Sequence, residues 1–188
     1  MKKPRKDGES REICAFSTAL GWMAIQGSSG RLEALTFGHA SEDKALNALL
    51  GFPTLNLSIR RWNDPLIRRL QAYAEGERES FRDIAIDWRP YTAFQRQVME
   101  ACREIPWGGV ISYAELARRA GHAGAARAVG RCMAANRVPL VVPCHRVVGA
   151  DGRLCGYSGP GGLETKQRLL ELEGACVPAR TLRFPAGR

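Results

Sequence analysis

The sequence predicts an α+β fold, in which a small antiparallel sheet precedes a mostly helical part. Its 188 residues provide for one medium domain or two small ones, and 45% of them are hydrophobic, enough to build a core. In the N-terminal region, apolar segments are separated by Gly21 and by a Gly-Ser-Ser-Gly turn at 27–30, a pattern typical of hairpins. Beyond residue 88, capping residues precede apolar positions at helical spacing. We therefore expect an N-terminal α/β domain over residues 1–88 and a C-terminal helical domain over residues 89–188.

The N-terminal half is expected to contain strands and two helices. The strands cover residues 13–19, 22–26 and 31–37 as an antiparallel meander, and residues 83–88 alternate as a last strand with Ile84 and Ile86 on one side. One helix begins at 41–43 and is stopped by Gly51 and Pro53, and Asp64-Pro65 opens the other, through residue 74. No converging carboxylates of a metal-dependent nuclease are found in this half. We therefore expect it to be a scaffold.

The C-terminal half is expected to contain a helix-turn-helix. A capping box at residues 92–95 starts one helix. Its apolar stripe consists of Phe94, Val98, Ala101 and Ile105. A second capping box at 112–115 starts a helix that ends before Gly121, and a further helix covers residues 124–135. Two short helices joined by a Gly-containing turn form this motif, which by itself indicates only that DNA binding is possible.

The helix expected at residues 124–135 has few side chains that could contact base edges. Arg127 is surrounded by the small residues Ala125, Ala126 and Ala128. A major-groove helix presents several polar side chains to bases, whereas a bare helix can approach the minor groove closely and insert one long side chain into the base stack. Taken alone, the pattern is explained more simply by packing alanines and a solvated arginine.

A reactive cysteine is expected after the apolar run at residues 138–142. The run predicts a buried strand, which Pro143 must end because it cannot donate to a ladder. Cys144 would then lie at the end of the strand beside His145 and Arg146, where a pocket can form and positive charge would favour the thiolate. A structural cysteine behind a core strand is the alternative that a Cys-His pair alone leaves open.

The net charge of +9 lies almost entirely in the C-terminal half. Residues 1–88 hold 13 Lys and Arg against 12 Asp and Glu, whereas residues 89–188 hold 15 against 7. A polyanion such as DNA is the simplest partner for this asymmetry, and a solvated basic surface is the alternative. Basic tails at residues 1–6 and 180–188 could add weak phosphate contacts.

The six cysteines indicate reduced thiols rather than a disulfide framework. The chain has no Cys-x-x-Cys pair, no signal peptide and no apolar stretch long enough to span a bilayer, so we expect a cytoplasmic protein without membrane contact. In the N-terminal half, Cys14 and His39 are too few for a structural zinc site. We expect no metal and no other cofactor.

Three separated motifs together resemble a known family. They are VISYAEL at residues 110–116, AARAVG at 125–130 and PCHRV at 143–147, in the family's order. From about residue 94 to 174 the chain resembles the O6-alkylguanine-DNA alkyltransferases, also called methylated-DNA–protein-cysteine methyltransferases. The resemblance implies an RNase H-like N-terminal domain. It also implies direct-reversal DNA repair, in which O6-alkylguanine is flipped out of the duplex and its alkyl group is transferred irreversibly to Cys144.

The resemblance assigns roles around Cys144. His145 would take the thiol proton through a bridging water, because two adjacent residues do not naturally point at each other, and Glu173 would orient His145. Tyr113 would protonate the departing guanine, with support from Lys166. Lys166 would belong to the substrate-binding residues. The residues that would carry the reaction are Cys144, His145, Glu173, Tyr113 and Asn136.

The resemblance also assigns the pocket and the DNA contacts. Asn136 would hold the helix-turn-helix against the active-site segment, Pro139 would be a pocket wall, and the Cys144 and Val147 carbonyls and the Ser158 amide would bind guanine. Arg127 would fill the space left by the flipped base, from the minor groove. Further expected DNA contacts are Ala125, Ala126, Ala128, Arg131 and Arg146. The partner would be double-stranded DNA, bound by a monomer without an obligate protein partner, at the nucleoid in a bacterium.

The chain also departs from the family pattern. His122-Ala123 replaces a common Asn-Pro before the recognition helix, Arg137 replaces a common Pro, and the pocket lid at 157–163 is two residues longer than a compact form. A longer lid could admit larger alkyl groups. Two other classes stay open: a non-catalytic lesion sensor, which carries Trp where Cys144 stands, and a cysteine hydrolase, which would need an oxyanion hole and a histidine within reach of the sulfur.

Overall fold

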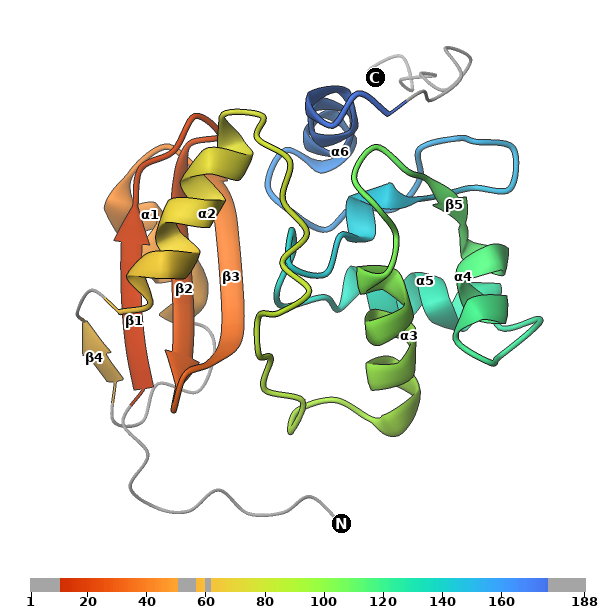
Figure 1. The fold of residues 1–188 in the computed structure, drawn as a ribbon, viewed down its shortest axis with the longest axis horizontal. Coiled ribbons are helices and arrows are strands. Elements are labelled where there is room, and N and C mark those ends of the chain that lie inside the picture. The colour runs from red at the N-terminus through yellow and green to blue at the C-terminus, as the bar shows by residue number, and fades with distance from the viewer. Residues whose placement is uncertain (1–10, 51–56, 60–61, 176–188) are drawn as a thin grey trace, which may run out of the picture.

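The computed structural model describes residues 11–50, 57–59 and 62–175 and combines a small mixed sheet with helices (Figure 1). The strands are β1 (Arg11–Phe16), β2 (Trp22–Ser28), β3 (Arg31–His39) and β4 (Leu57–Ile59), in the order β3-β2-β1-β4. The meander β1-β2-β3 is antiparallel, as predicted, whereas β4 pairs in parallel with β1. Strand β4 is not among the predicted strands, because three residues are too few for an alternating pattern.

One helix covers each face of this sheet (Figure 1). Helix α1 (Glu42–Leu50) packs Ala45 and Leu49 against a cluster with Ile13, Ala24 and Ala34. Helix α2 (Asp64–Ala74) packs on the other face, where the alternate side chains of β1 and β2 point. Its N-cap is Asn63, whose side chain accepts from the Leu66 amide at 3.3 Å, one residue before the predicted start. The expected helix stop at Gly51 and Pro53 lies outside the described residues, as do the basic tails.

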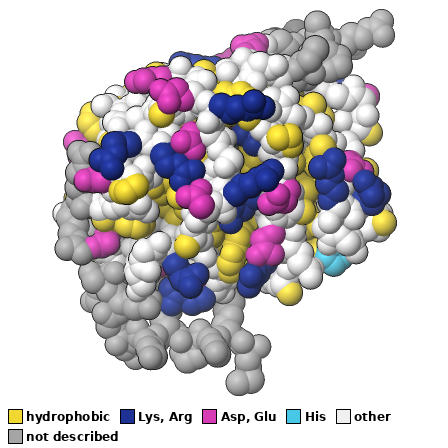
Figure 2. All heavy atoms as spheres, in the orientation of Figure 1, with side chains coloured by type: hydrophobic (Ala, Val, Ile, Leu, Met, Phe, Trp, Pro, Cys, Tyr) yellow, Lys and Arg dark blue, Asp and Glu magenta, His cyan; other side chains and the backbone are white. Residues whose placement is uncertain are grey.

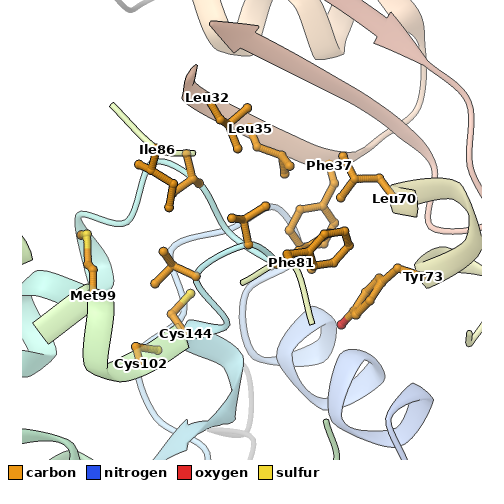
Figure 3. Close-up of a cluster of buried hydrophobic side chains, with 14 of the residues drawn as sticks. Leu32, Leu35, Phe37, Leu70, Tyr73, Phe81, Ile86, Met99, Cys102 and Cys144 are labelled. Carbon is orange, nitrogen blue, oxygen red and sulfur yellow. The ribbon is translucent and has the colours of Figure 1, made fainter. Parts of the chain in front are cut away.

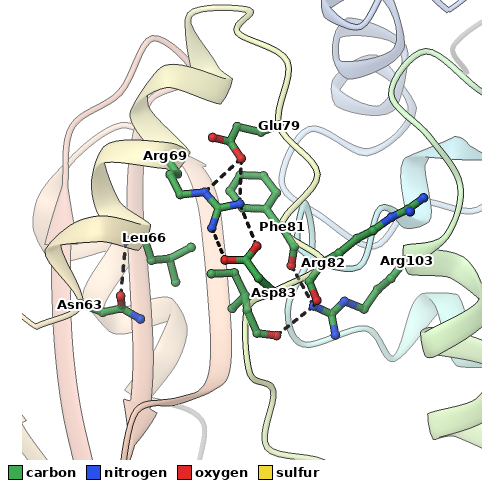
Figure 4. Close-up of polar contacts among 9 residues, drawn as sticks. Asn63, Leu66, Arg69, Glu79, Phe81, Arg82, Asp83 and Arg103 are labelled. Atoms are coloured by element: carbon green, nitrogen blue, oxygen red, sulfur yellow. Dashed lines mark hydrogen bonds and ion pairs between the residues drawn. The ribbon is translucent and has the colours of Figure 1, made fainter.

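The prediction of a strand at residues 83–88 is wrong. Among the described residues, a single β-bridge forms in this segment, between Leu32 and Ile86. At this bridge the Ala85 carbonyl accepts from the Leu32 amide and the Asp87 amide donates to the Leu32 carbonyl, while a turn from Phe81 to Ile84 precedes it. The carbonyl groups of that turn bind a guanidinium. Arg103 donates to the carbonyl oxygens of Phe81, Arg82 and Ile84 at 2.8 to 2.9 Å, while Arg69 of α2 pairs with Glu79 and Asp83 (Figure 4). The segment therefore connects the sheet half of the chain to the helical half without forming a strand.

The C-terminal half contains α3 (Ala93–Arg103), α4 (Tyr113–Arg119), α5 (Ala126–Ala134) and α6 (Gly162–Leu172), with β5 (Ile111–Ser112) parallel to β6 (Val147–Val148). The capping box of Thr92 and Gln95 is confirmed. At α4, Ser112 accepts from the Glu115 amide at 3.1 Å, but the Glu115 carboxylate pairs with arginines of its own helix. Only half of the second predicted box therefore forms. Helices α4 and α5 are the two short helices of the predicted motif, and the turn between them contains Gly121 and Gly124.

The buried strand predicted at residues 138–142 is also wrong. The chain turns at Leu140, which has φ +69°, and the Val142 amide donates to the Val138 carbonyl at 2.9 Å. Asn136 closes this buried turn, since its amide donates to the Val142 carbonyl at 2.8 Å and its oxygen accepts from the Val138 amide at 3.1 Å. The apolar run forms a turn in which the Asn136 side chain satisfies one main-chain carbonyl and one main-chain amide. The short strand β6 follows Cys144 rather than preceding it.

The largest hydrophobic cluster runs through both halves of the chain. Figure 3 shows Phe37 and Leu70 of the sheet half close to Phe81, and Cys102 of α3 close to Cys144. Cys144 therefore lies where the two halves pack together. In the part of the chain that the structure describes, no helix is both long enough and apolar enough to cross a membrane.

Candidate active site

Cys144 opens a one-turn 3-10 helix, Cys144–Arg146, directly after the turn closed by Asn136. Its side chain is nearly buried, with 7% of the residue exposed, and it lines a pocket of about 360 Å³. Among the other residues around this pocket are Leu35, Phe37 and Leu49 from the sheet half and Asn136, Pro139, Tyr157, Ser158 and Pro160 from the helical half. A ligand in the pocket would meet the cysteine sulfur at one wall.

The Cys144 thiol is expected to be protonated in the free protein. Burial raises the pKa of Cys144 above its ordinary value of 9.0, while the Asn136 side chain and the Lys166 ammonium act in the opposite direction. Of the two neighbours expected to favour the thiolate, His145 does so through its main-chain amide, whereas Arg146 is paired with Glu173; the effect of burial is larger. The thiol therefore needs a base before it can attack an electrophile.

His145 is the nearest base by sequence, and Glu173 holds it. The His145 side chain is fully buried, and its Nε2 lies 2.8 Å from Glu173 Oε1. Burial lowers the pKa of His145 from 6.5 despite the opposing effect of Glu173, so the neutral imidazole donates from Nε2. Nδ1 is then the acceptor, and it is buried without a hydrogen-bond partner among the described residues. This arrangement suits proton transfer to Nδ1 through a water.

Glu173, at the end of α6, is the common acceptor of a buried hydrogen-bond network. Its two oxygens accept from His145, from Arg146 at 2.8 and 2.9 Å, and from the hydroxyl group of Tyr73 at 2.7 Å. Burial raises the pKa of Glu173, but the hydrogen bonds from His145 and Arg146 more than offset this effect, so the pKa is about 2. A Cβ atom at Gly108 would lie 2.9 Å from the Glu173 carbonyl oxygen, which requires glycine there.

Arg146 does not have the position predicted for a DNA contact. Only 3% of the residue is exposed, and besides Glu173 it binds the Ile105 carbonyl oxygen at 2.6 Å. Since its guanidinium is paired within the core, it supports the active site rather than the DNA surface. Tyr73 is not among the predicted site residues, because it precedes His145 by 72 residues and has no sequence motif around it.

Acid is expected to destabilise the protein through this network. The folded-state pKa of Glu173 lies below its ordinary 4.5, so its stabilisation is complete above pH 4.5 and is lost as the pH falls toward 2. Because the pKa of buried His145 is also lowered, protonation in the unfolded state begins to oppose folding below pH 6.5. Urea unfolding at pH 5, 4 and 3 should show a fall in stability as Glu173 is protonated. Glu171→Gln, at an exposed carboxylate of the same helix, should keep this fall, whereas Glu173→Gln should reduce it. An unaltered fall in Glu173→Gln would contradict the assignment.

Tyr113 and Lys166 lie together beside the lid. The Tyr113 hydroxyl group donates to the Cys155 carbonyl at 3.1 Å, and the Lys166 ammonium, fully buried, donates to the carbonyls of Val147 and Cys155 at 2.6 and 2.9 Å. The ammonium also lies 5.8 Å from the Tyr113 ring centre. Burial raises the pKa of Tyr113, so its phenol keeps its proton at neutral pH. The Val147 carbonyl oxygen, which is expected to bind guanine, has two lone pairs, and Lys166 occupies one of them.

The lid at residues 157–163 is tied to two helices. Ser158 donates from its hydroxyl group to the Ala134 carbonyl at the end of α5 at 2.9 Å, and Thr165 of α6 donates to the Pro160 carbonyl at 2.6 Å. The Tyr157 hydroxyl group is buried with no partner among the described residues. The two additional lid residues therefore lie within a closed, hydrogen-bonded loop at the pocket mouth.

Helix α5 presents Arg127 and Arg131 on its exposed side. Ala125, Ala126 and Ala128 are half-buried, and Gly130 packs near the Tyr113 ring. Within the described ranges, neither arginine forms an ion pair. On the face drawn in Figure 2, by contrast, many Lys and Arg side chains lie next to Asp and Glu side chains. The exposed side of α5 is a cationic surface next to the residues that line the pocket.

The two residues considered for a zinc site have other contacts. The Cys14 thiol faces the Trp62 carbonyl at 4.0 Å, and His39 Nε2 lies 2.7 Å from the Thr36 hydroxyl group. In residues 11–50, 57–59 and 62–175, no group of three or more His, Cys, Asp or Glu side chains could hold a metal ion.

Comparisons with known proteins agree with this geometry. Residues 93–175 match the family model described as the DNA-binding domain of 6-O-methylguanine DNA methyltransferase. A methylated-DNA–protein-cysteine methyltransferase of Mycolicibacterium paratuberculosis is 48% identical over 118 residues, which are 63% of this chain and 69% of that protein. One from Methanosarcina acetivorans is 45% identical over 109 residues, 58% of this chain and 67% of that protein.

A solved structure extends the likeness to the whole fold. The crystal structure of Mycobacterium tuberculosis OGT in complex with DNA superposes with a TM-score of 0.72 and 32% sequence identity. The match covers 87% of this chain and 93% of that chain, so it includes the small sheet as well as the helices.

Proposed function

Because the chain belongs to the 6-O-methylguanine DNA methyltransferase family, we propose that it repairs alkylated DNA by direct reversal. It takes O6-alkylguanine out of the duplex and transfers the alkyl group to Cys144 in a single turnover. The observation that carries this proposal is the position of Cys144, whose thiol lines a pocket next to a buried His145–Glu173 pair.

The reaction starts with the proton of the thiol. A water passes it from Cys144 to Nδ1 of His145, while Glu173 stabilises the resulting imidazolium. The thiolate attacks the alkyl carbon, so a carbon–sulfur bond forms as the bond to O6 breaks. The departing guanine takes a proton on its ring from Tyr113, and Lys166 beside the Tyr113 ring stabilises the phenolate. The thioether is chemically stable, so the protein is consumed.

The pocket residues bind and align the base. Pro139 supplies an apolar wall, the Cys144 and Val147 carbonyls accept from the guanine amino group, and the Ser158 amide donates to O6. Asn136 keeps the turn before Cys144 closed, through its bonds to the main chain at Val138 and Val142. These contacts hold the alkyl carbon in line with the sulfur.

Helix α5 binds the minor groove of double-stranded DNA. Its half-buried alanines, Ala125, Ala126 and Ala128, let the helix backbone approach the groove, and Arg127 enters the base stack where the flipped nucleotide was. Arg131, exposed one turn later, contacts a phosphate. A relative was crystallised in complex with DNA, which supports this partner. The protein acts as a monomer in the cytoplasm, at the nucleoid in a bacterium.

Residues 1–88 form a scaffold domain with an RNase H-like sheet, and residues 89–188 form the DNA-binding and acceptor domain. An antiparallel meander extended by a strand parallel to β1, with a helix on each face, supports this topology. The intact Cys144 argues against the sensor class. The hydrolase class is disfavoured because His145 directs Nε2 to Glu173 rather than to the sulfur.

Stoichiometry tests the proposed function. A duplex with one O6-methylguanine is supplied in excess, and repair should stop at one lesion per protein molecule. Cys144→Ser should repair none, because a serine hydroxyl group is a poor nucleophile at neutral pH. Cys14→Ser is the matched control, since this residue lies on β1 with its thiol directed at the Trp62 carbonyl, and it should behave like the wild type. Continued turnover, or repair by Cys144→Ser, would contradict the proposal.

A further inference from the structure

We infer that Tyr73 is a positioning residue for the alkyl transfer, because its hydroxyl group shares the Glu173 oxygen that orients His145. The inference rests on the proposed function and extends the active site into the sheet half. Tyr73 lies in the last turn of α2, and its hydroxyl group donates to Glu173 Oε1 at 2.7 Å, while the same hydroxyl oxygen lies 3.5 Å from His145 Nε2. The sheet half thus supplies a hydrogen-bond donor to the active site.

The ring and the hydroxyl group of Tyr73 have separate surroundings. The ring packs at 5.8 Å from the Phe81 ring and edge-on at 5.3 Å from the Trp107 ring. In Figure 3 the hydroxyl group points away from the Phe37 and Phe81 side chains. Burial and the nearby Glu173 carboxylate raise the pKa of Tyr73 well above 10, so the group is a permanent donor. A phenylalanine would keep the ring contacts and remove only this hydrogen bond.

The hydroxyl group is not needed to keep Glu173 ionised. Arg146 donates twice to the carboxylate, and the Gly108 amide lies 3.4 Å from Oε2. What Tyr73 adds is a donor on Oε1, the oxygen that His145 uses. Each additional donor draws negative charge away from the bond to His145, and this weakens the stabilisation of the imidazolium.

The other charged groups around His145 do not depend on Tyr73. Arg146 next to it and Lys166 from α6 lower the pKa of His145, whereas Glu173 raises it. Cys144 of the same short helix is a protonated thiol in the free protein. Since these groups stay in place, removing the Tyr73 hydroxyl group should strengthen the effect of Glu173 and raise the pKa of His145.

The titration of His145 tests this directly. The chain has three histidines, so NMR of the imidazole signals can follow each one, with His39→Gln and His122→Gln used for assignment. In Tyr73→Phe the midpoint of His145 should rise by about half a pH unit to one pH unit, as expected for loss of one hydrogen bond to a charged group. The acid limb of the single-turnover rate should move in the same direction, and the rate should fall about threefold to tenfold at pH values below the wild-type midpoint.

Two further variants separate positioning from packing. Tyr91→Phe also removes a buried phenol hydroxyl group, one that has no hydrogen-bond partner among the described residues, and it should change neither the His145 midpoint nor the rate. In a Glu173→Gln background, adding Tyr73→Phe should have no further effect, because Tyr73 acts through the carboxylate.

An unchanged His145 midpoint in a folded Tyr73→Phe protein would overturn the inference, as would an equal effect of Tyr73→Phe with and without Glu173. If Tyr73→Phe is partly unfolded at room temperature, the titration and the rate are measured for wild type and variant at a lower temperature at which both are folded. The titration needs no DNA. A wild-type protein that transfers no alkyl group therefore refutes the proposed function, while the NMR result still decides the role of Tyr73.

Discussion

Replacing Glu173 by alanine is expected to lower the free energy of unfolding by about 3–5 kcal/mol, because it leaves buried Arg146 and His145 without their common partner. Arg146 would keep its bond to the Ile105 carbonyl, but its charge would lie unpaired in the core. Urea unfolding at pH 7 measures the change. Alkyl transfer should fall as well, since His145 loses the group that orients it.

The matched control is Glu171→Ala. Glu171 lies two residues earlier and is exposed, with a hydrogen bond from Gln167 of the same helix. Its loss should change stability by no more than about 0.5 kcal/mol. Equal destabilisation by the two variants would show that the buried network does not stabilise the fold.

Replacing Arg127 by alanine is expected to reduce repair of duplex DNA about a hundredfold, because nothing then offsets the few kcal/mol needed to unstack and extrude a nucleotide. The pocket and Cys144 are untouched by this change, since Arg127 is exposed on α5. Transfer from free O6-benzylguanine base should therefore keep the wild-type rate. Single-turnover rates with the two substrates measure the difference.

Loss of one positive charge does not by itself explain this expected loss of duplex repair. Arg82→Ala removes the same charge from an exposed residue that pairs with Glu104, and it should reduce duplex repair less than twofold in 0.15 M salt, where such charges are largely screened. If Arg127→Ala slowed both substrates alike, its role would lie in the pocket or in the fold rather than in base flipping.

Local signals in the sequence identified most of the regular elements. The glycine turns placed β1, β2 and β3, the Asp64-Pro65 pair placed α2 to within one capping residue, and the box at Thr92 placed α3. Each of these signals acts on neighbouring residues, so a single sequence contains it. The resemblance to a family supplied the site residues, whose roles remain proposals.

The elements that were predicted wrongly depend on distant partners. Residues 83–88 alternate like a strand, but the Ile84 carbonyl binds Arg103 and the segment makes an isolated bridge, to Leu32 of β3. The apolar run at 138–142 was interpreted as a strand, yet it is a buried turn because Asn136 satisfies its main chain. Apolar content indicates burial and does not distinguish a strand from a turn.

Charged and polar residues of the site show the same limit. Arg146 was expected at DNA because it follows Cys144 and His145 in a basic half, but Glu173 holds it in the core. Tyr73 has an ordinary place on the buried side of α2, and only the fold brings its hydroxyl group to Glu173. A residue's partners at long range have no signature near it in the chain.

Peptide mapping by tandem mass spectrometry after reaction with an O6-methylguanine duplex tests the central claim most directly. We predict one added methyl group per molecule, located on the peptide that contains Cys144, and none on the other five cysteines. A methyl group on exposed Cys155, or an unmodified protein after the lesion has been repaired, would contradict the assignment of Cys144 as the acceptor.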